Sequence, residues 1–298
     1  MDEAFHEGVP AELLAELRQR RDGPGLARLG AQLLLGAAGG ALLVVAATPA
    51  AFAVGLVLSA LFQLATFAIL HECVHRTAFR TDLLCSLGAW AASFFQLMAP
   101  PLMRAFHFTH HRHTHDTALD PELGGLELMA RWPRGVMWLA TMSGLPVLLA
   151  RLLLLVVTAL GGARLVPFVQ PQRRREVWLG SLGLVLLHAA FVAAALTFEP
   201  RILRLYLAVP LAHALLSLYI TAEHRGLPGT GSILERTRSL DVGPGLRFLL
   251  WNMPLHAEHH AYPAVPFHAL PRLRQALAPQ LRHRTGGLLA LHWRGGRD

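Results

Sequence analysis

Residues 50–75 read AAFAVGLVLSALFQLATFAILHECVH and join two signals in one continuous stretch. Residues 50–70 carry no charged side chain, and a helix of about 20 apolar residues is long enough to cross a bilayer. His71, Glu72 and His75 follow immediately, and helical residues four apart share a face. The stretch therefore predicts a membrane-spanning helix whose end presents two imidazoles at the membrane surface.

Five further apolar stretches accompany this one along the chain. They cover residues 29–48, 83–103, 136–157, 177–198 and 202–221. Arg151 lies inside residues 136–157, where a charge at the bilayer centre costs at least about 2.5 kcal/mol. We therefore interpret residues 83–103 and 136–157 as interfacial or re-entrant. The predicted fold is an all-α membrane protein with about four transmembrane helices and these interfacial or re-entrant helices, followed by a polar C-terminal segment from about residue 224.

Composition excludes several classes of protein. Of the 298 residues, 53% are hydrophobic and 15% are charged, whereas a soluble domain carries about 25% charged residues. Intrinsic disorder is excluded because disordered chains are rich in charge and poor in apolar residues. The chain has two cysteines, Cys73 and Cys85, which form no CxxC pair. This excludes a disulfide scaffold and cysteine-ligated zinc or iron–sulfur sites.

The positive charge predicts the orientation in the membrane. The formal net charge is +8, and all 27 basic residues are arginines. In so apolar a chain we interpret them as cytoplasmic flanks of membrane spans and expect no nucleic-acid partner. Arg18, Arg20, Arg21 and Arg28 precede the first span and place the N-terminus in the cytoplasm. Two hairpins of spans then bring both termini and all the histidine motifs to the cytosolic side.

Eight of the 17 histidines fall into three short motifs, which we call the first, second and third boxes. The first box is HECVH at residues 71–75, the second is HFTHH at 107–111, and the third is HAEHH at 256–260. On a helix, each spacing aims two or three imidazoles at one point. Imidazole suits zinc, copper, iron and nickel, and eight ligands exceed the three or four of one zinc ion. The boxes therefore predict two metal ions held by His71, His75, His107, His110, His111, His256, His259 and His260.

Two other types of metal site match parts of the sequence. The first box also reads HExxH, the motif of zinc proteases, in which Glu72 would be the general base of an intramembrane protease. That interpretation leaves the second and third boxes without a purpose. A ferritin-like carboxylate di-iron bundle needs two ExxH motifs and two inward glutamates. Only Glu72–His75 and Glu3–His6 fit ExxH, and Glu3 lies in a polar tail.

The three boxes, in this order and separated by membrane segments, resemble the integral-membrane fatty acid desaturase superfamily, which also includes related hydroxylases and carotenoid oxygenases. The stretch HFTHHRHTHDTALDPE at residues 107–122 is similar to the family's second box with its downstream Asp-Pro. The stretch NMPLHAEHHAYPAVPFHALPRL at residues 252–273 is similar to the third box and its proline-rich exit. The resemblance extends from about residue 50 to residue 273, and it implies four spans beneath a cytosolic helical cap that holds the histidine boxes.

The resemblance implies a function and its cofactors. The metals would be two non-haem iron ions, and O2 would be the co-substrate. The reaction would introduce a double bond into a fatty acyl chain of a lipid, and hydroxylation or ketolation of a lipid or carotenoid is the alternative. Electrons would come from outside, from ferredoxin or from cytochrome b5 with its reductase. The expected location is a membrane, the bacterial inner membrane in our interpretation.

The resemblance also extends the list of site residues. The family often has a further ligand upstream of the third box, and here His224 occupies the end of the last predicted span. We therefore predict His224 as a ninth ligand. The residues expected to orient the ligands, without binding metal themselves, are Glu72, His113, His115, Asp120 and Asn252. We expect no catalytic side chain beyond the metal centre.

The domain organisation follows from the same signals. Residues 1–28 are predicted to be a cytosolic, amphipathic N-terminal segment. Residues 29–298 are predicted to form a single desaturase-like membrane domain that includes the cytosolic C-terminal cap. No repeat or low-complexity linker divides this region.

Overall fold

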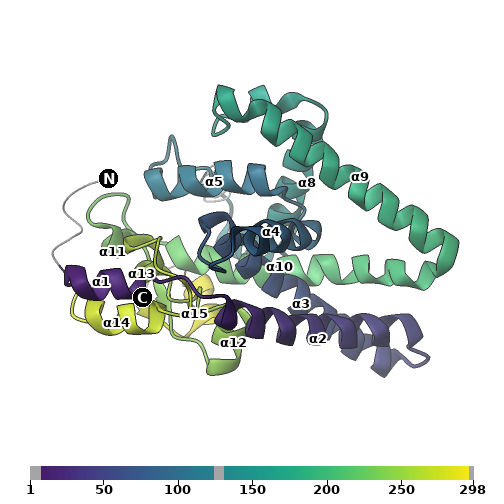
Figure 1. The fold of residues 1–298 in the computed structure, drawn as a ribbon, viewed down its shortest axis with the longest axis horizontal. Coiled ribbons are helices and arrows are strands. Elements are labelled where there is room, and N and C mark those ends of the chain that lie inside the picture. Colours follow the sequence, from purple (N-terminus) through teal and green to yellow (C-terminus); the bar gives the residue numbers. More distant parts are fainter. Residues whose placement is uncertain (1–7, 124–130, 295–298) are drawn as a thin grey trace.

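The computed structural model describes residues 8–123 and 131–294, and in these ranges the fold is almost entirely helical. Four long segments have the length and apolarity to cross a membrane: Asp22–Val45, Pro49–His75, Pro171–Phe198 and Pro200–His224. They contain helices α2 (Asp22–Val45), α3 (Pro49–His75), α9 (Arg174–Phe198) and α10 (Ala208–His224), with the 3-10 turns η3 (Pro171–Arg173) and η4 (Pro200–Leu207) before the last two. The predicted all-α membrane fold with four spans is confirmed (Figure 1).

Helices α2 and α3 form a tight hairpin that carries the first box. The Thr48 side chain accepts a hydrogen bond from the Ala51 N–H, and Pro49 starts α3, so both residues favour a helix start. A Cβ atom at Gly39 would lie 2.7 Å from the Ser59 backbone nitrogen, and one at Gly55 would lie 2.9 Å from that of Leu43. Only glycine permits this close approach, as at many helix contacts within membranes. The hairpin thereby fixes the position of the first box at the end of α3.

Two shorter helix pairs are sharply bent and lie between the two hairpins in the sequence. Helices α4 (Asp82–Gln96) and α5 (Pro100–His113) meet at 89°, and α7 (Arg134–Ser143) and α8 (Leu145–Ala159) meet at 60°. Pro100 and Gly144 stand at the two breaks. Arg151 is buried in α8 and donates hydrogen bonds to the backbone and side-chain oxygens of Gln96. Such bends do not fit straight spans, in agreement with the interfacial or re-entrant interpretation.

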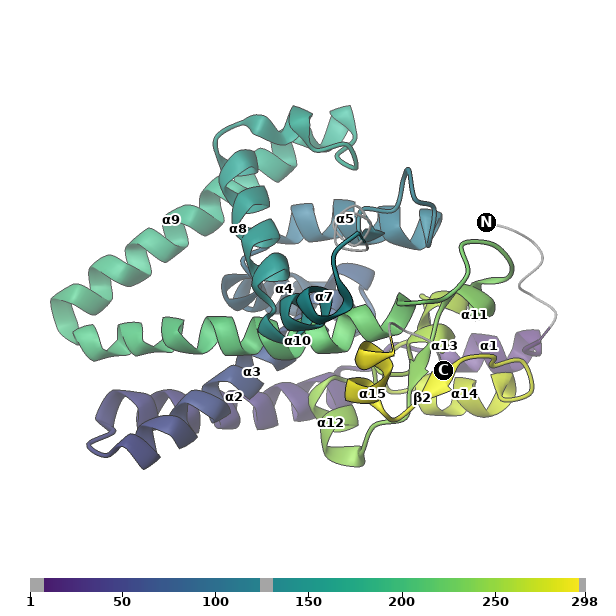
Figure 2. The same ribbon diagram turned by 180° about the vertical axis from the view of Figure 1, so that it is seen from behind.

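The C-terminal segment and the first helix form a cap at one end of the long helices. The cap contains α1 (Ala11–Leu17), α11 (Ile233–Arg236), α12 (Pro244–Leu249), α13 (His256–Ala261), α14 (Leu270–Leu277) and α15 (Leu288–Trp293), together with the short parallel strands β1 (Ser239–Leu240) and β2 (Arg284–Thr285). Figures 1 and 2 show these elements clustered at one end, away from the α9–η4 turn. The turn η2 (Gly162–Leu165) lies apart from the cap, between α8 and η3.

The predicted N-terminal segment contains a short helix before the first long helix. Helix α1 ends at Leu17, and the first long helix begins at Asp22. Leu14 and Leu17 are buried in a cluster with the apolar residues of α14, and Glu16 pairs with Arg272 across this contact. Residues 1–7 lie outside the described ranges. The N-terminal helix is therefore packed against the cap.

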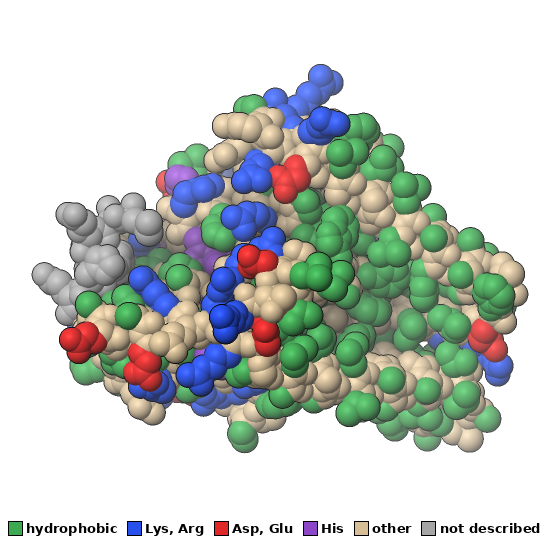
Figure 3. Space-filling model, viewed as in Figure 1, with side chains coloured by type: hydrophobic (Ala, Val, Ile, Leu, Met, Phe, Trp, Pro, Cys, Tyr) green, Lys and Arg blue, Asp and Glu red, His purple; other side chains and the backbone are tan. Residues whose placement is uncertain are grey.

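The surface divides into apolar and basic regions. Leu34, Leu153, Leu160 and Phe198 are among many large apolar side chains that are more than half exposed. Hydrophobic side chains dominate the end formed by the long helices, whereas arginines gather toward the cap and the start of α9 (Figure 3). Exposed apolar surface of this extent is typical of contact with a membrane rather than water.

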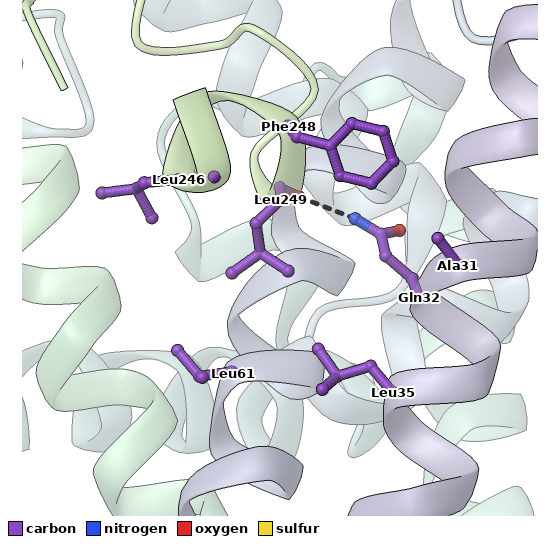
Figure 4. A pocket seen from close by; sticks show the side chains of 8 residues that line it. Ala31, Gln32, Leu35, Leu61, Leu246, Phe248 and Leu249 are labelled. Carbon is purple, nitrogen blue, oxygen red and sulfur yellow. Dashed lines mark hydrogen bonds between the residues drawn. The ribbon is translucent and has the colours of Figure 1, made fainter. Parts of the chain in front are cut away.

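The cap is fastened to α2 at the end of α12. Arg28 donates to the carbonyl oxygens of Arg247 and Phe248, and Gln32 donates to that of Leu249. These contacts satisfy carbonyls that the end of a helix leaves without partners. Beside them lies an apolar cavity of about 410 Å³ between α2, α3 and α12 (Figure 4). Its lining residues include Leu35 and Leu61 and no histidine.

Candidate metal centre

Four helices bring the histidine boxes together. The first box ends α3, the second occupies the last turns of α5, and the third forms most of α13. His224 is the last residue of α10. The ligands therefore come from the ends of the long helices α3 and α10, from α5, and from α13 in the cap (Figure 2). All nine histidines that the sequence predicts as ligands meet in one place.

The nine histidines separate into two groups, in each of which the candidate ligand atoms lie within 4.8 Å of one another. The first, the five-histidine group, contains His71, His75, His107, His111 and His259. The second, the four-histidine group, contains His110, His224, His256 and His260. Each group has enough donors for a metal ion, and imidazole rings of the two groups touch, as His111 stacks on His260. The geometry therefore offers two adjacent sites.

The Nε2 atoms point inward. His107 Nε2 lies 2.8 Å from His75 Nε2 and 3.0 Å from His111 Nε2. In the other group, His256 Nε2 lies 2.8 Å from His224 Nε2 and His110 Nε2 lies 3.2 Å from His260 Nε2. Two nitrogens bound at right angles to one metal lie about 2.9 Å apart, given metal–nitrogen bonds of about 2.0–2.1 Å. The spacing is therefore that of neighbouring ligands.

Hydrogen bonds between histidines do not account for this arrangement. A ring nitrogen either donates one proton or accepts at one lone pair, whereas His107 Nε2 faces two other Nε2 atoms. His71 is only 2% exposed, and neither of its ring nitrogens has a hydrogen-bond partner in the described structure. Buried nitrogens normally have partners. A cation bound in each group would supply the missing partners of the inward-facing nitrogens, so the residues present fit two metal ions.

Burial also selects the protonation state that binds metal. It holds the pKa of His256, His259 and His260 well below the usual histidine range, and neighbouring histidines of the cluster lower the pKa further. The neutral imidazole is the form that coordinates metal. The third box is therefore kept in its ligating form at neutral pH.

Outer partners orient the rings of the four-histidine group through Nδ1. The His110 N–H donates to Asp120, with Nδ1 2.9 Å from Oδ1, and His256 Nδ1 lies 3.2 Å from Glu223 Oε1. His224 Nδ1 lies 3.2 Å from the Arg236 carbonyl oxygen. A partner at Nδ1 fixes the tautomer and leaves the Nε2 lone pair free for a metal.

Glu72 is buried beside His71. Its Oε1 is 3.5 Å from His71 Nδ1. Its Oε2 accepts hydrogen bonds from the Thr77 hydroxyl and the Phe267 N–H. The two hydrogen bonds hold the carboxylate in place next to the ring.

Of the other residues predicted to orient the ligands, Asp120 and His115 contact the nine histidines, whereas His113 and Asn252 show no such contact in the described ranges. Asp120 contacts His110, and it also accepts a hydrogen bond from the His115 N–H. The buried His115 ring lies 5.3 Å from that of His224, centroid to centroid. His113 and Asn252 form no hydrogen bond or ring contact with the nine histidines in the described ranges. Asn252 instead adopts a φ of 56° and donates to the Phe267 carbonyl, so its role is in the chain turn before the third box.

Three polar residues near the site were missed by the sequence analysis. Glu223 contacts His256, the Thr114 hydroxyl lies 3.4 Å from His260 Nδ1, and a Glu122 oxygen lies 3.7 Å from His110 Nε2. Glu223 adjoins His224 and Glu122 follows Asp120-Pro121, so an acidic residue next to a predicted ligand was the available signal. That signal does not tell which way a side chain points, because only packing decides it.

The comparison with known families agrees with this geometry. No curated protein matches the chain. The family model described as fatty acid desaturase matches residues 47–289, a region that contains every histidine of the two groups. The match covers most of the chain, from just before α3 to the start of α15, and leaves α2 outside it. The chain therefore belongs to the fatty acid desaturase family.

Proposed function

We propose that this protein is an O2-dependent di-iron oxidoreductase that introduces a double bond into the fatty acyl chain of a lipid. The observation that supports the proposal best is the convergence of nine buried or half-buried histidines into two adjacent groups at the junction of membrane helices and cap. Imidazole ligands suit iron, and desaturases are typically di-iron enzymes. Family membership supports the same chemistry.

The chain's own residues would position the metal ions, orient their imidazole ligands and exclude water. Bound iron would supply the oxidising power for cleaving an unactivated C–H bond, which no side chain provides. The nine histidines would hold two iron ions at fixed positions, and Asp120, Glu223 and Glu72 would fix three of the rings. Most of these groups are buried, which keeps water from the reacting carbon.

The overall reaction balances with an external donor. One hydrogen leaves each of two adjacent carbons, a double bond forms between them, and O2 is reduced to two molecules of water. This consumes two electrons and two protons from outside. We propose ferredoxin, or cytochrome b5 with its reductase, as the donor. Arg174 and Arg175 are exposed at the start of α9 and would attract an acidic donor, whereas Arg272 and Arg274 are already paired with Glu16 and Asp241.

The proposed orientation places the cap and both termini in the cytosol, in a bacterial inner membrane. The clustering of arginines toward the cap supports this orientation because positively charged flanks favour the cytoplasmic side (Figure 3). The substrate would then reach the metals from the bilayer, where acyl chains are abundant. A membrane-embedded acyl lipid is the substrate class that this arrangement favours.

Two alternatives make different demands on the site. Hydroxylation or ketolation of a lipid or carotenoid uses the same histidine boxes, so only the products distinguish it from desaturation. A zinc protease would need Glu72 to face a metal-bound water. Glu72 Oε2 is already engaged by the Thr77 hydroxyl and the Phe267 N–H, and the second and third boxes have no role in a protease, so the site disfavours that alternative.

The test is expression of the full chain in bacterial membranes with a ferredoxin and its reductase, followed by mass spectrometry of total lipids. His110→Ala, made in the same membranes, is the control. We expect acyl chains lighter by two hydrogens that are absent with His110→Ala. Products heavier by one oxygen atom would establish the hydroxylase instead. Lipids identical to those of the control would contradict both forms of the proposal.

A further inference from the structure

We infer that Glu122 is a tenth metal ligand, which supplies a carboxylate oxygen to the four-histidine group. The inference rests on the metal centre proposed above and deepens it. Its starting point is that the two groups are unequal, with five histidines in one and four in the other. Glu122 was not among the residues that the sequence pointed to, and it comes from the segment between α5 and α7.

Glu122 lies on the inward side of His110, next to the four-histidine group. Its Oε2 lies 3.7 Å from His110 Nε2, which is the inward-facing nitrogen of that ring. The outer nitrogen of the same ring is occupied by Asp120. Two donor atoms bound to one metal at about 2.1 Å lie about 3.4 Å apart in a tetrahedral arrangement and about 4.2 Å apart when opposite. The observed separation falls between these values.

The loop that carries Glu122 is built around the same group. The Asp120 carboxylate contacts His110 Nδ1 and also accepts hydrogen bonds from the backbone N–H groups of His115 and Glu122. One carboxylate therefore orients a ligand ring and the backbone that presents Glu122 to it. Asp120 therefore links the position of Glu122 to that of His110 in the second box.

Glu122 also has a nearby positive charge in the membrane region. Arg151, buried in α8, interacts electrostatically with the Glu122 carboxylate. Arg151 is held by hydrogen bonds to Gln96. A buried cation of this kind would otherwise be costly among apolar helices, and the Glu122 carboxylate offsets part of that cost.

A carboxylate in one group only would make the two metal ions unlike. It would add a negative charge and an oxygen donor to the four-histidine site, while the five-histidine site would keep neutral nitrogen ligands. The two sites would then differ in affinity and in spectroscopic signature. That difference can be measured without turnover.

The experiment loads detergent-purified protein with ⁵⁷Fe²⁺ under anaerobic conditions and records Mössbauer spectra and iron affinity by chelator competition. We expect Glu122→Gln to change one of two quadrupole doublets. It should also lower the affinity for one of the two iron ions by at least about 10–100-fold, the loss typical of an outer partner. Acetate added to Glu122→Ala should restore part of that affinity, because it supplies the missing carboxylate.

Glu12→Gln is the matched control, because it removes the same charge from an exposed residue of α1. It should leave both doublets as they are in the parent protein. Glu122→Asp tests whether a shorter carboxylate retains the second ion, and circular dichroism reports folding of each variant. Parent-like doublets and affinities in Glu122→Gln would overturn the inference. A parent protein that binds no pair of iron ions would instead overturn the proposed function.

Discussion

The five-histidine group and the four-histidine group differ in what stands behind their imidazoles. In the four-histidine group, Asp120 and Glu223 contact the outer nitrogens of His110 and His256. In the five-histidine group, His71 has Glu72 at 3.5 Å, and the His259 Nδ1 has no hydrogen-bond partner in the described structure. The four-histidine group thus has a hydrogen-bonded carboxylate at His110 and a close carboxylate at His256, whereas the five-histidine group depends more on packing between rings.

The comparison also explains why two boxes contain adjacent histidines. His110 and His111 belong to different groups, as do His259 and His260. Successive helical residues point about 100° apart, since a turn takes 3.6 residues. Residues four apart share a face, so His107 joins His111 and His256 joins His260. A single HxxHH motif therefore contributes histidines to both groups.

The largest effect is expected from replacing either of two neighbouring histidines that belong to different groups. His259→Ala removes a ligand from the five-histidine group, and His260→Ala removes one from the four-histidine group. Each should abolish lipid oxidation, because a lost ligand should cost at least the ~10–100-fold of a lost outer partner. Mössbauer spectra of the iron-loaded variants should show changes in different doublets. Identical spectral changes would mean that the two groups do not form separate sites.

The second prediction concerns the acidic support of the four-histidine group. Asp120→Ala removes the partner of His110 and two backbone hydrogen bonds, so one iron ion should bind about 10–100-fold more weakly. The measurement is chelator competition, with the exposed Asp82→Ala as control. Equal weakening of both iron ions would show that Asp120 supports the cluster as a whole rather than one group.

The third prediction tests the single acid behind the five-histidine group. Glu72→Gln keeps the shape of the side chain and should reduce lipid oxidation by about 10-fold, near the lower limit for outer partners, without eliminating it. Product formation per bound iron is the measurement. If this variant binds metal normally but forms no product, while His259→Ala remains active, the protease interpretation would replace the desaturase one.

The smallest effect is expected at a histidine that belongs to neither group. His113→Ala should change activity by no more than about twofold, the range of a substitution without a specific contact. It has no hydrogen bond or ring contact with the nine histidines in the described ranges. A loss comparable to that of Asp120→Ala would place His113 among the residues that orient the ligands.

The sequence by itself determined the spans and the candidate ligands. Span length and the absence of charge are local properties, and they predict the four long helices to within a few residues at most ends. Helical spacing within each box is equally local, so it shows that the histidines of a box converge. The His224 prediction came from family resemblance, and the structure places this residue in the four-histidine group.

Only the tertiary structure decided how the boxes combine. The division into five and four depends on contacts such as that of His110 with His260, which come from α5 and the distant α13. The same packing brought Glu223 and Glu122 next to site histidines, whereas His113 and Asn252 form no hydrogen bond with these histidines in the described ranges. Sequence spacing specifies which residues share a helix face. It does not specify which other helix that face meets, because this is set by the hairpin packing, the 89° bend before α5 and the fastening of the cap to α2.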